Sequence, residues 1–421
     1  MEKSIIFDNV KHYITKVYLV RTMKNTNTEL PNHHKILLIL DTQFVHWKGT
    51  QRFLFEMGSY LTKHGYEVTL LENANSELPD KPVKMDVNIP FKIVSLRFRK
   101  IFGVYVVPKS FIMSEKPDII YATNLNSLPF IPSAGFKTIF GCLVLNISSL
   151  PYLQKSEKIK FRLKSYIFVT IQRFLWRNHQ IMIHALNEDQ GDWVRKITKN
   201  RYPVRVIGIP VEYPYMDIGT RIAQKAKNDK FTILYFGAFS NYRGFKEFID
   251  IIKFIETKEI NEDIIFLIAG DGPLKSQVVE VATSYDNVKF IERPSDNEKW
   301  KIMLNSDLFI YPSVIENFSI IAAEAQICGL PSLVADILPL KNIVINGKTG
   351  HVLALNNIEK MAYDKIYEYM QLWMDNYEKY KEMRIEISVL SKRLCKEEVL
   401  PKLLDMIQYF VQNDLVVCSP K

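Results

Sequence analysis

Cysteine is scarce in this sequence, and its four cysteines lie far apart. No two of them form a Cys-x-x-Cys pair, which argues against a zinc site or a redox dithiol. We expect buried, reduced thiols, and such thiols suit a reducing compartment. The four are Cys142, Cys328, Cys395 and Cys418.

Long apolar runs are missing as well. No run is long enough to span a bilayer, and residues 1–34 lack the uninterrupted apolar core of a signal peptide. We therefore expect a cytoplasmic protein whose residues 1–30 form an extension that packs on the first domain or lies on a surface. Repeats of the solenoid or propeller kind are not visible.

Acidic residues are the minority among the charges, with 46 aspartates and glutamates against 55 lysines and arginines. The net charge of +9 attracts anions such as phosphate esters, acidic lipids or nucleic acid. Because no zinc-finger, homeodomain or RNP pattern is present, nucleic acid is not an expected partner. Phosphate esters and anionic lipid surfaces stay open.

What the sequence does have is apolar segments that alternate between strand and helix character. With 421 residues, of which 47% are hydrophobic, the chain is long enough for two cores. A strand at 35–40, a helix at 51–63 and a strand at 67–71 form a βαβ unit, which opens a doubly wound sheet. Further strands are expected at 117–121, 137–145, 181–184 and 204–207, with a basic helix at 156–178.

A second set of strands follows a polar segment at 208–228. The expected strands are 231–236, 264–269, 288–291, 308–311 and 332–335, with helices at 244–254 and 320–328 and a helical tail from about 360 to 414. This order predicts an α/β protein of two Rossmann-like domains that face each other across a cleft. We place the domains at 31–210 and 211–395, with 396–421 as a C-terminal helix that packs back on the first.

The strongest local motif surrounds two glutamates. A strand ends at Pro312, a loop carries Glu316, and a helix that begins near Phe318 carries Glu324. The helix start offers unpaired amides to phosphate, and a carboxylate accepts hydrogen bonds from the two hydroxyls of a ribose or an adjacent pair on a sugar. The pair therefore suits a nucleotide sugar. The alternative is a helix cap at the first glutamate and a surface ion pair at the second.

Two glycine-bearing turns accompany this motif. Gly237 begins a strand-to-helix turn that ends with Arg243, and such a turn lets the backbone approach a diphosphate that the arginine neutralises. Gly270 and Gly272 flank an aspartate in half of a dinucleotide fingerprint, without its third glycine. For these two glycines a tight turn is the alternative.

Together, the three motifs resemble the C-terminal domain of retaining glycosyltransferase family 4, also called glycosyl transferases group 1, which has the GT-B fold. The resemblance covers 231–355 and includes the segments 306–313, 329–331 and 346–350. It implies that Glu324 binds the ribose, that Glu316 contacts the donor sugar at the reacting centre, and that helix-start amides approach the diphosphate. The donor-binding residues it implies, together with those that the turns suggest, are Glu324, Phe318, Ser319, Asn317, Gly237, Gly49, Lys48, Gly270, Gly272 and Arg293.

The sequence departs from the family pattern in places. The family has an arginine where Ala238 stands, so one phosphate cation is missing; Arg243 stands for the other, and Lys48 on the first loop is a candidate replacement. The family's glycine after the phenylalanine is Ser319 here. A histidine commonly reaches the reacting centre from the first domain, and His46 and His184 are the candidates, although a lone histidine is more often structural.

The resemblance implies a hexosyltransferase that retains the anomeric configuration, with a first domain for the acceptor and a second for the donor. The leaving diphosphate would help to deprotonate the acceptor, and Arg243 would stabilise its charge as a catalytic residue. No metal or other cofactor is expected; the donor is a UDP- or GDP-linked sugar. Two alternatives are a sugar-nucleotide epimerase and a degenerate, non-catalytic transferase that serves as a binding subunit.

The expected acceptor is a saccharide, and a basic segment suggests that it is lipid-linked. Residues 155–177 combine lysines and arginines with aromatic residues, which suits a helix lying on an anionic membrane. The protein would then be peripheral on the cytoplasmic membrane face. An ordinary surface helix with a solvated basic face is the alternative.

Overall fold

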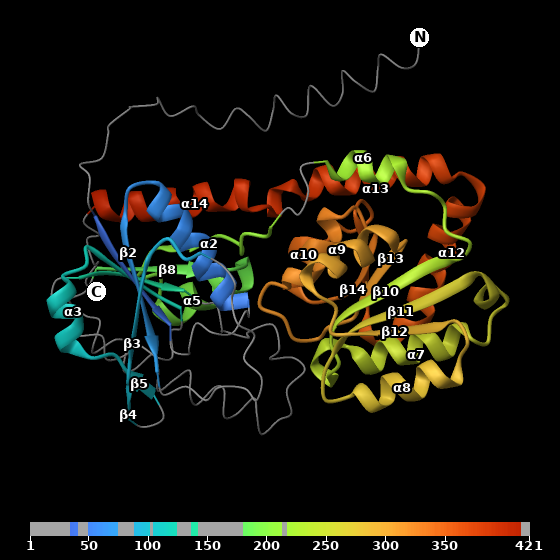
Figure 1. Ribbon diagram of the computed structural model, residues 1–421, viewed down its shortest axis with the longest axis horizontal. Helices are drawn as coiled ribbons and strands as arrows, with labels where there is room; N and C mark the ends of the chain where they lie inside the picture. The colour runs from blue at the N-terminus through green and yellow to red at the C-terminus, as the bar shows by residue number, and fades with distance from the viewer. Residues whose placement is uncertain are drawn as a thin grey trace, which may run out of the picture.

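Two parallel β-sheets, one in each half of the chain, organise the protein (Figure 1). The computed structural model describes residues 34–40, 49–74, 88–101, 104–123, 136–141, 180–212 and 217–413. The candidate residues His46 and Lys48, the N-terminal extension and the basic segment 155–177 lie outside these ranges.

The first sheet has seven strands in the order β3-β2-β1-β6-β7-β8-β9. They are β1 (Lys35–Leu40), β2 (Glu67–Asn73), β3 (Lys92–Leu96), β6 (Ile119–Ala122), β7 (Lys137–Gly141), β8 (Ile181–Ala185) and β9 (Val204–Val206). All described neighbours run parallel, and the central strands are apolar on both faces because helices cover the sheet. Around it are α2 (Gly49–Lys63), α3 (Lys109–Glu115), α5 (Glu188–Thr198) and an antiparallel pair, β4 (Arg99–Ile101) and β5 (Val104–Val106).

The second sheet has six parallel strands in the order β12-β11-β10-β13-β14-β15. They are β10 (Phe231–Ala238), β11 (Ile264–Asp271), β12 (Val288–Glu292), β13 (Leu308–Tyr311), β14 (Ser332–Ala335) and β15 (Gly350–Leu353). Its helices are α7 (Phe245–Ile255), α8 (Lys275–Ser284), α9 (Asp296–Asn305), α10 (Ile320–Ile327), α11 (Leu338–Ile343), α12 (Ile358–Asp375) and α13 (Tyr377–Ser391). Short 3₁₀ turns are η2 (Asn241–Arg243), η3 (Glu259–Asp263), η4 (Leu355–Asn357) and η5 (Lys392–Leu394).

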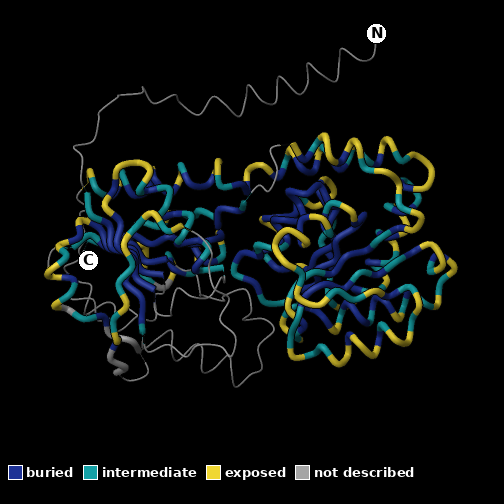
Figure 2. The backbone as a smooth tube through the Cα atoms, in the orientation of Figure 1, coloured by how far each residue is buried: buried dark blue, intermediate teal, exposed yellow. Residues whose placement is uncertain are grey.

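Both sheets are interior layers. Figure 2 shows the strands of each half as buried, with exposed backbone concentrated on the surrounding helices and loops. The order β10-β13 in the second sheet places two strand ends beside each other at the point where the strand order reverses, which is where ligands bind in open α/β sheets. The loops after these two strands carry the predicted donor residues.

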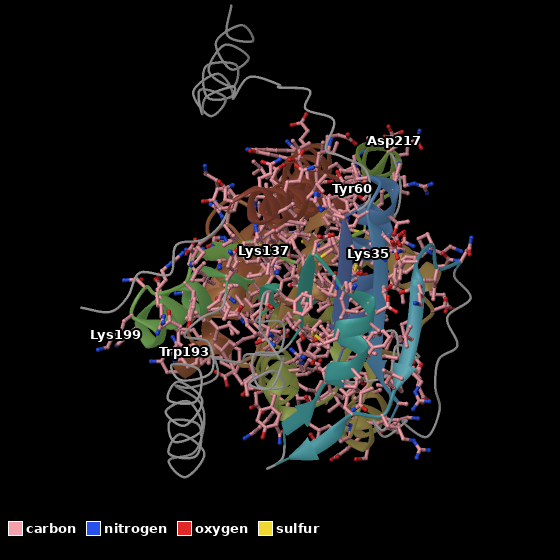
Figure 3. The ribbon with its side chains drawn as sticks, turned by 90° about the vertical axis from the view of Figure 1, so that its left-hand side faces the viewer. Lys35, Tyr60, Lys137, Trp193, Lys199 and Asp217 are labelled. Carbon is pink, nitrogen blue, oxygen red and sulfur yellow. The ribbon has the colours of Figure 1, made fainter. Side chains whose placement is uncertain are left out.

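The chain crosses between the halves twice, and the crossings lie side by side. Val211 and Cys395 form a parallel bridge, and the Lys396 amide donates to the Val211 carbonyl at 2.9 Å. The helix α14 (Lys396–Gln412) then runs back along α2 (Figure 1). Near its end, Lys137 of the first sheet, labelled in Figure 3, donates to the Val411 carbonyl at 2.8 Å.

The other connection between the sheets contains α6 (Ile218–Gln224), which packs on α13 beside the second sheet (Figure 1). The described chain thus leaves the first sheet after β9 and enters the second at β10. The predicted residue limits of the domains, 31–210, 211–395 and 396–421, stay predictions.

Each strand predicted from the sequence overlaps a strand of the structure, and three match to the residue: β1, β13 and β14. Gly65 ends α2 with φ of 85°, as its predicted left-handed cap requires. The helix α10 begins at Ile320, as in the predicted helix 320–328 and two residues after the start near Phe318 that the glutamate motif suggested. Among the described residues, no helix combines the length and the apolar character needed to cross a bilayer.

Candidate functional site

Glu316 lies in the loop between β13 and α10 and is 6% exposed. Its Oε1 forms an ion pair with Arg243 and accepts hydrogen bonds from the Tyr311 hydroxyl at 2.8 Å and from Ser313 Oγ at 3.1 Å. Burial, and next to it the Glu316 carboxylate, raises the pKa of Tyr311 well above its ordinary value, so the phenol stays protonated and donates. The sequence pattern missed both hydroxyl donors.

Arg243 ends the turn η2 after β10, and its side chain is 38% exposed. Burial alone would lower its pKa, but the Glu316 carboxylate outweighs it and the net pKa is raised, so the guanidinium is charged. Its Nη1 also donates to the Ile315 carbonyl at 3.0 Å. Its other N–H groups have no hydrogen-bond partner among the described residues. The predicted phosphate cation is therefore anchored at one nitrogen and has donors left for an anion.

A close approach fixes the turn around Arg243. Gly244 has φ of 69°, and a Cβ placed there would lie 2.0 Å from the Pro312 carbonyl oxygen. The carbonyl of Tyr242 accepts hydrogen bonds from the Val314 amide at 3.1 Å and from Ser313 Oγ at 3.1 Å. The loop after β10 and the loop after β13 thus form one rigid unit, which brings Arg243 and Glu316 together.

Glu324 lies on α10 and is 2% exposed. Its Oε1 accepts from Lys299 Nζ at 2.6 Å and from Arg52 Nη1 at 3.3 Å. Lys299 belongs to α9 of the second sheet, whereas Arg52 belongs to α2 of the first. The predicted alternative was an ion pair on the surface. Glu324 does form ion pairs, but its carboxylate is buried between two cations from different halves of the chain.

The segment between the two glutamates contacts the first half of the chain. The Asn317 carbonyl accepts from Asn187 Nδ2 at 2.8 Å. A Cβ placed on Gly208 would lie 2.7 Å from the Phe318 ring, so this ring packs directly on the crossing segment. Ser319 precedes α10 with φ of 77°, and its buried Oγ has no partner among the described residues. The predicted donor residues at 317–319 are therefore brought to the boundary between the halves.

The starts of two helices meet at this boundary. Gly49 is the first residue of α2, and a Cβ placed there would lie 3.2 Å from Cδ1 of Ile320, the first residue of α10. Helix starts carry unpaired amides and a partial positive charge, and neither helix has an acidic residue in its first turn. The arrangement suits an anion that approaches both helix starts.

The glycines of the second turn pack against the first. A Cβ at Gly270 would lie 2.0 Å from the Gly237 carbonyl oxygen, and one at Gly272 would lie 2.5 Å from the Phe239 amide nitrogen. The predicted alternative for this motif, a tight turn, thus accounts for both glycines. Arg293, a predicted donor-binding residue, pairs with Asp271 at 2.6 Å on the surface at the same strand edge.

His184 is a structural residue in this arrangement. It is fully buried in the first sheet, where Nδ1 accepts from the Tyr121 hydroxyl at 2.6 Å and Nε2 donates to the Ile207 carbonyl at 2.7 Å. Burial lowers its pKa to about 4, so the ring is neutral at pH 7. The prediction that His184 reaches the reacting centre is corrected, because both ring nitrogens are already used inside the core.

A crevice of about 300 Å³ lies between the halves beside the Phe318 ring. Its walls include Leu186 and Ile207 from the first half, Asn342 from the second, and Leu394 and Lys402 near the second crossing. Among the described residues, no group of three or more His, Cys, Asp or Glu side chains is placed to hold a metal ion. Cys328 and Cys395 are buried and free, as expected for these two, and the other two cysteines lie outside the described residues.

With the geometry established, comparisons with known proteins identify part of the chain. Residues 218–387 match the family model of glycosyl transferases group 1. This group 1 match contains Arg243, Lys299, Glu316 and Glu324, whereas Arg52 lies outside it. The carboxylate pair and its cations from the second half of the chain therefore lie within the matched segment.

Relatives and solved structures agree with this match. The chain is 27% identical over 351 residues to the UDP-Gal:alpha-D-GlcNAc-diphosphoundecaprenol alpha-1,3-galactosyltransferase of Escherichia coli, covering 80% of this chain and 87% of that one. It spans between about a third and about half of the length of the curated relatives that match first.

Two solved structures share the fold. WaaG, a glycosyltransferase involved in lipopolysaccharide biosynthesis, superimposes with a TM-score of 0.59 at 14% identity over 88% of this chain and 99% of its own. The Anabaena protein HepE, solved in complex with UDP-glucose, superimposes with a TM-score of 0.60 at 14% identity, over 90% of this chain and 100% of its own. The predicted GT-B fold is confirmed: two Rossmann-like domains with parallel sheets.

Proposed function

We propose that this protein is a retaining glycosyltransferase of family 4 that moves a hexose from a UDP- or GDP-linked donor to a saccharide acceptor carried on a lipid diphosphate. The observation that carries the proposal is a pair of buried carboxylates, Glu316 before α10 and Glu324 on α10, each of which is paired with a cation. A GT-B cleft with this pair suits a ligand that has hydroxyls at both ends and a diphosphate between them.

Each residue has a role that follows from its surroundings. Glu324 accepts the hydroxyls of the ribose, and Glu316 accepts a hydroxyl of the donor sugar while Arg243 fixes its direction. The free donors of Arg243 and the helix-start amides of α2 and α10 stabilise charge on the leaving diphosphate. The protein thus acts mainly by holding donor and acceptor in position, and the departing diphosphate takes part in accepting the acceptor's proton.

The acceptor class rests on relatives. The galactosyltransferase of Escherichia coli acts, by its name, with UDP-galactose on a saccharide diphosphoundecaprenol. This relative covers most of both chains, which supports an acceptor of the same general kind here. The crevice beside Phe318 lies next to the Glu316 loop and has walls from both halves, so it is the proposed entry for the acceptor saccharide. Peripheral attachment to the cytoplasmic membrane face through residues 155–177 is part of the proposal.

The test is turnover by the purified chain with UDP- and GDP-hexoses and a saccharide diphosphate-lipid acceptor. We expect one donor to give product with the same anomeric configuration, assigned by NMR. Glu324→Gln should lower turnover at least a hundredfold with the fold intact, whereas Glu378→Gln, at an exposed ion pair on α13, should leave it unchanged.

Two other outcomes would contradict the proposal. Conversion of the donor into an epimeric nucleotide sugar without acceptor would favour the epimerase. Failure to bind any common uridine or guanosine donor in calorimetry would favour the non-catalytic binding subunit.

A further inference from the structure

One arginine of the first domain connects three separate segments. Arg52 lies on α2, and its side chain is 15% exposed. Its Nη1 donates to Glu324 Oε1 at 3.3 Å, and its Nη2 donates to Glu212 Oε2 at 3.1 Å. Glu212 belongs to the first crossing between the domains, next to the bridge at Val211. A single guanidinium therefore joins the proposed ribose carboxylate to the crossing segment.

The contact leaves one face of Glu324 open. Lys299 and Arg52 both donate to Oε1, and Oε2 accepts no hydrogen bond from the described residues. A carboxylate with one oxygen fixed by two cations has a fixed orientation, so the other oxygen keeps one direction for a ligand hydroxyl. Lys299 fixes this orientation of the carboxylate from within the second domain. Arg52 fixes it only in the present arrangement of the two domains.

The charges continue to the crossings. Lys396, at the start of α14 and next to the second crossing, lies 4.0 Å from Glu212 Oε1 and 3.7 Å from Glu56 Oε2. Glu56 is on α2, one turn after Arg52. Opposite charges thus alternate from Glu324 through Arg52, Glu212 and Lys396 to Glu56, around the place where the chain crosses twice. A movement at the crossings would change the distance between Arg52 and Glu324.

We propose that Arg52 is a positioning residue for donor binding, which orients the Glu324 carboxylate only in the closed arrangement of the two domains. This inference rests on the proposed function. It makes nucleotide affinity depend on a residue of the acceptor domain that touches no part of the nucleotide. Closure and donor binding therefore favour each other, since each stabilises the same ion pair.

The side chain has to be arginine for this role. A guanidinium has two Nη groups in a planar fork and bonds two carboxylates at once, whereas a lysine ammonium is a compact point charge. Replacement of Arg52 also leaves Glu324 paired with Lys299 at 2.6 Å, so no buried carboxylate loses its last cation. The variants below are therefore expected to fold.

The experiment measures the Kd of UDP and of GDP by calorimetry, and KM and kcat with the matching nucleotide hexose. Relative to the wild-type chain, Arg52→Met should weaken the preferred nucleotide about tenfold and raise KM by the same factor, with kcat changed less than twofold; tenfold corresponds to about 1.4 kcal/mol. Arg52→Lys and Glu212→Gln should each give a smaller loss. The matched control, Arg195→Met at exposed ion pairs on α5, should bind as the wild-type chain does.

A double-mutant cycle separates positioning from a general structural effect. Since Arg52 acts through Glu324, Arg52→Met should cost no further affinity in a Glu324→Gln background. If Arg52→Met bound the nucleotide as tightly as the wild-type chain, this inference would be overturned and the proposed function would stand. The same holds if Arg52→Met lost as much affinity in the Glu324→Gln background as in the wild-type chain. No nucleotide binding by the wild-type chain would overturn the proposed function and this inference together.

Discussion

The two buried glutamates of the site are held in different ways. Glu316 contacts Arg243, Tyr311 and Ser313, which lie in the second domain at the ends of β10 and β13 or on the loops that follow them. Glu324, only eight residues later, is shared between Lys299 of the second domain and Arg52 of the first. The difference teaches that one end of the proposed donor site is anchored on the loops of the second domain, whereas the contacts of Glu324 join the two domains.

The largest expected effect tests the Glu316 end of the proposed site. Arg243→Ala removes a cation that pairs with the buried Glu316 carboxylate, together with the donors proposed for the diphosphate. We expect turnover to fall roughly a hundredfold to a thousandfold, as loss of one preorganised charge-stabilising donor does. Steady-state kinetics with the donor measures it, and Arg243→Lys should recover part of the rate because it keeps the charge. A fall of less than about threefold in the alanine variant would show that Arg243 has no such role.

A second prediction concerns the stability of the shared end. Lys299→Met removes the shorter of the two cation contacts to Glu324, and both side chains are buried. We expect the free energy of unfolding to fall by about 2 kcal/mol, because Arg52 remains as a weaker partner. Urea unfolding measures it, with Lys365→Met at the more exposed ion pair to Glu368 as the control, for which we expect less than about 0.5 kcal/mol. Equal losses of unfolding free energy in Lys299→Met and Lys365→Met would contradict the role of Lys299 as the main cation partner of Glu324.

The smallest effect lies between the two glutamates. Ser319 has a positive φ of 77°, and its buried Oγ has no partner among the described residues. Ser319→Gly relieves the backbone strain and removes a buried hydroxyl, so we expect a gain in unfolding free energy of about 1 kcal/mol. Thermal unfolding measures it as a higher Tm. A lower Tm would mean that the hydroxyl has a partner outside the described residues.

The two glutamates also differ in how much of their surroundings the sequence could predict. Arg243 and Glu316 lie on the loops after two neighbouring strands, and the strand-loop-helix order places both loops at the same sheet edge, so both residues were predicted as site residues. The Glu324 end depends on Arg52, which is 272 positions away in the sequence and sits on a helix with no motif of its own. No local pattern reports a contact that only the packing of two domains creates.

His184 shows the opposite error. Its place at a strand end suggested a role in catalysis. In the structure the His184 side chain is buried, and its two ring nitrogens bond the Tyr121 hydroxyl and the Ile207 carbonyl. The glycines at 270 and 272 show a similar ambiguity, since close packing on the neighbouring turn requires them whether or not a diphosphate is nearby. In both cases one residue type serves two purposes, and only the neighbours distinguish them.

The division of roles between the two glutamates is tested most directly by calorimetry with UDP or GDP, which lack the sugar, on Glu316→Gln and Glu324→Gln. The proposed roles predict that Glu324→Gln loses affinity for the nucleotide about tenfold or more, whereas Glu316→Gln binds the nucleotide as the wild-type chain does and loses only sugar transfer. Equal loss of nucleotide affinity in both variants, or loss in Glu316→Gln alone, would contradict the account.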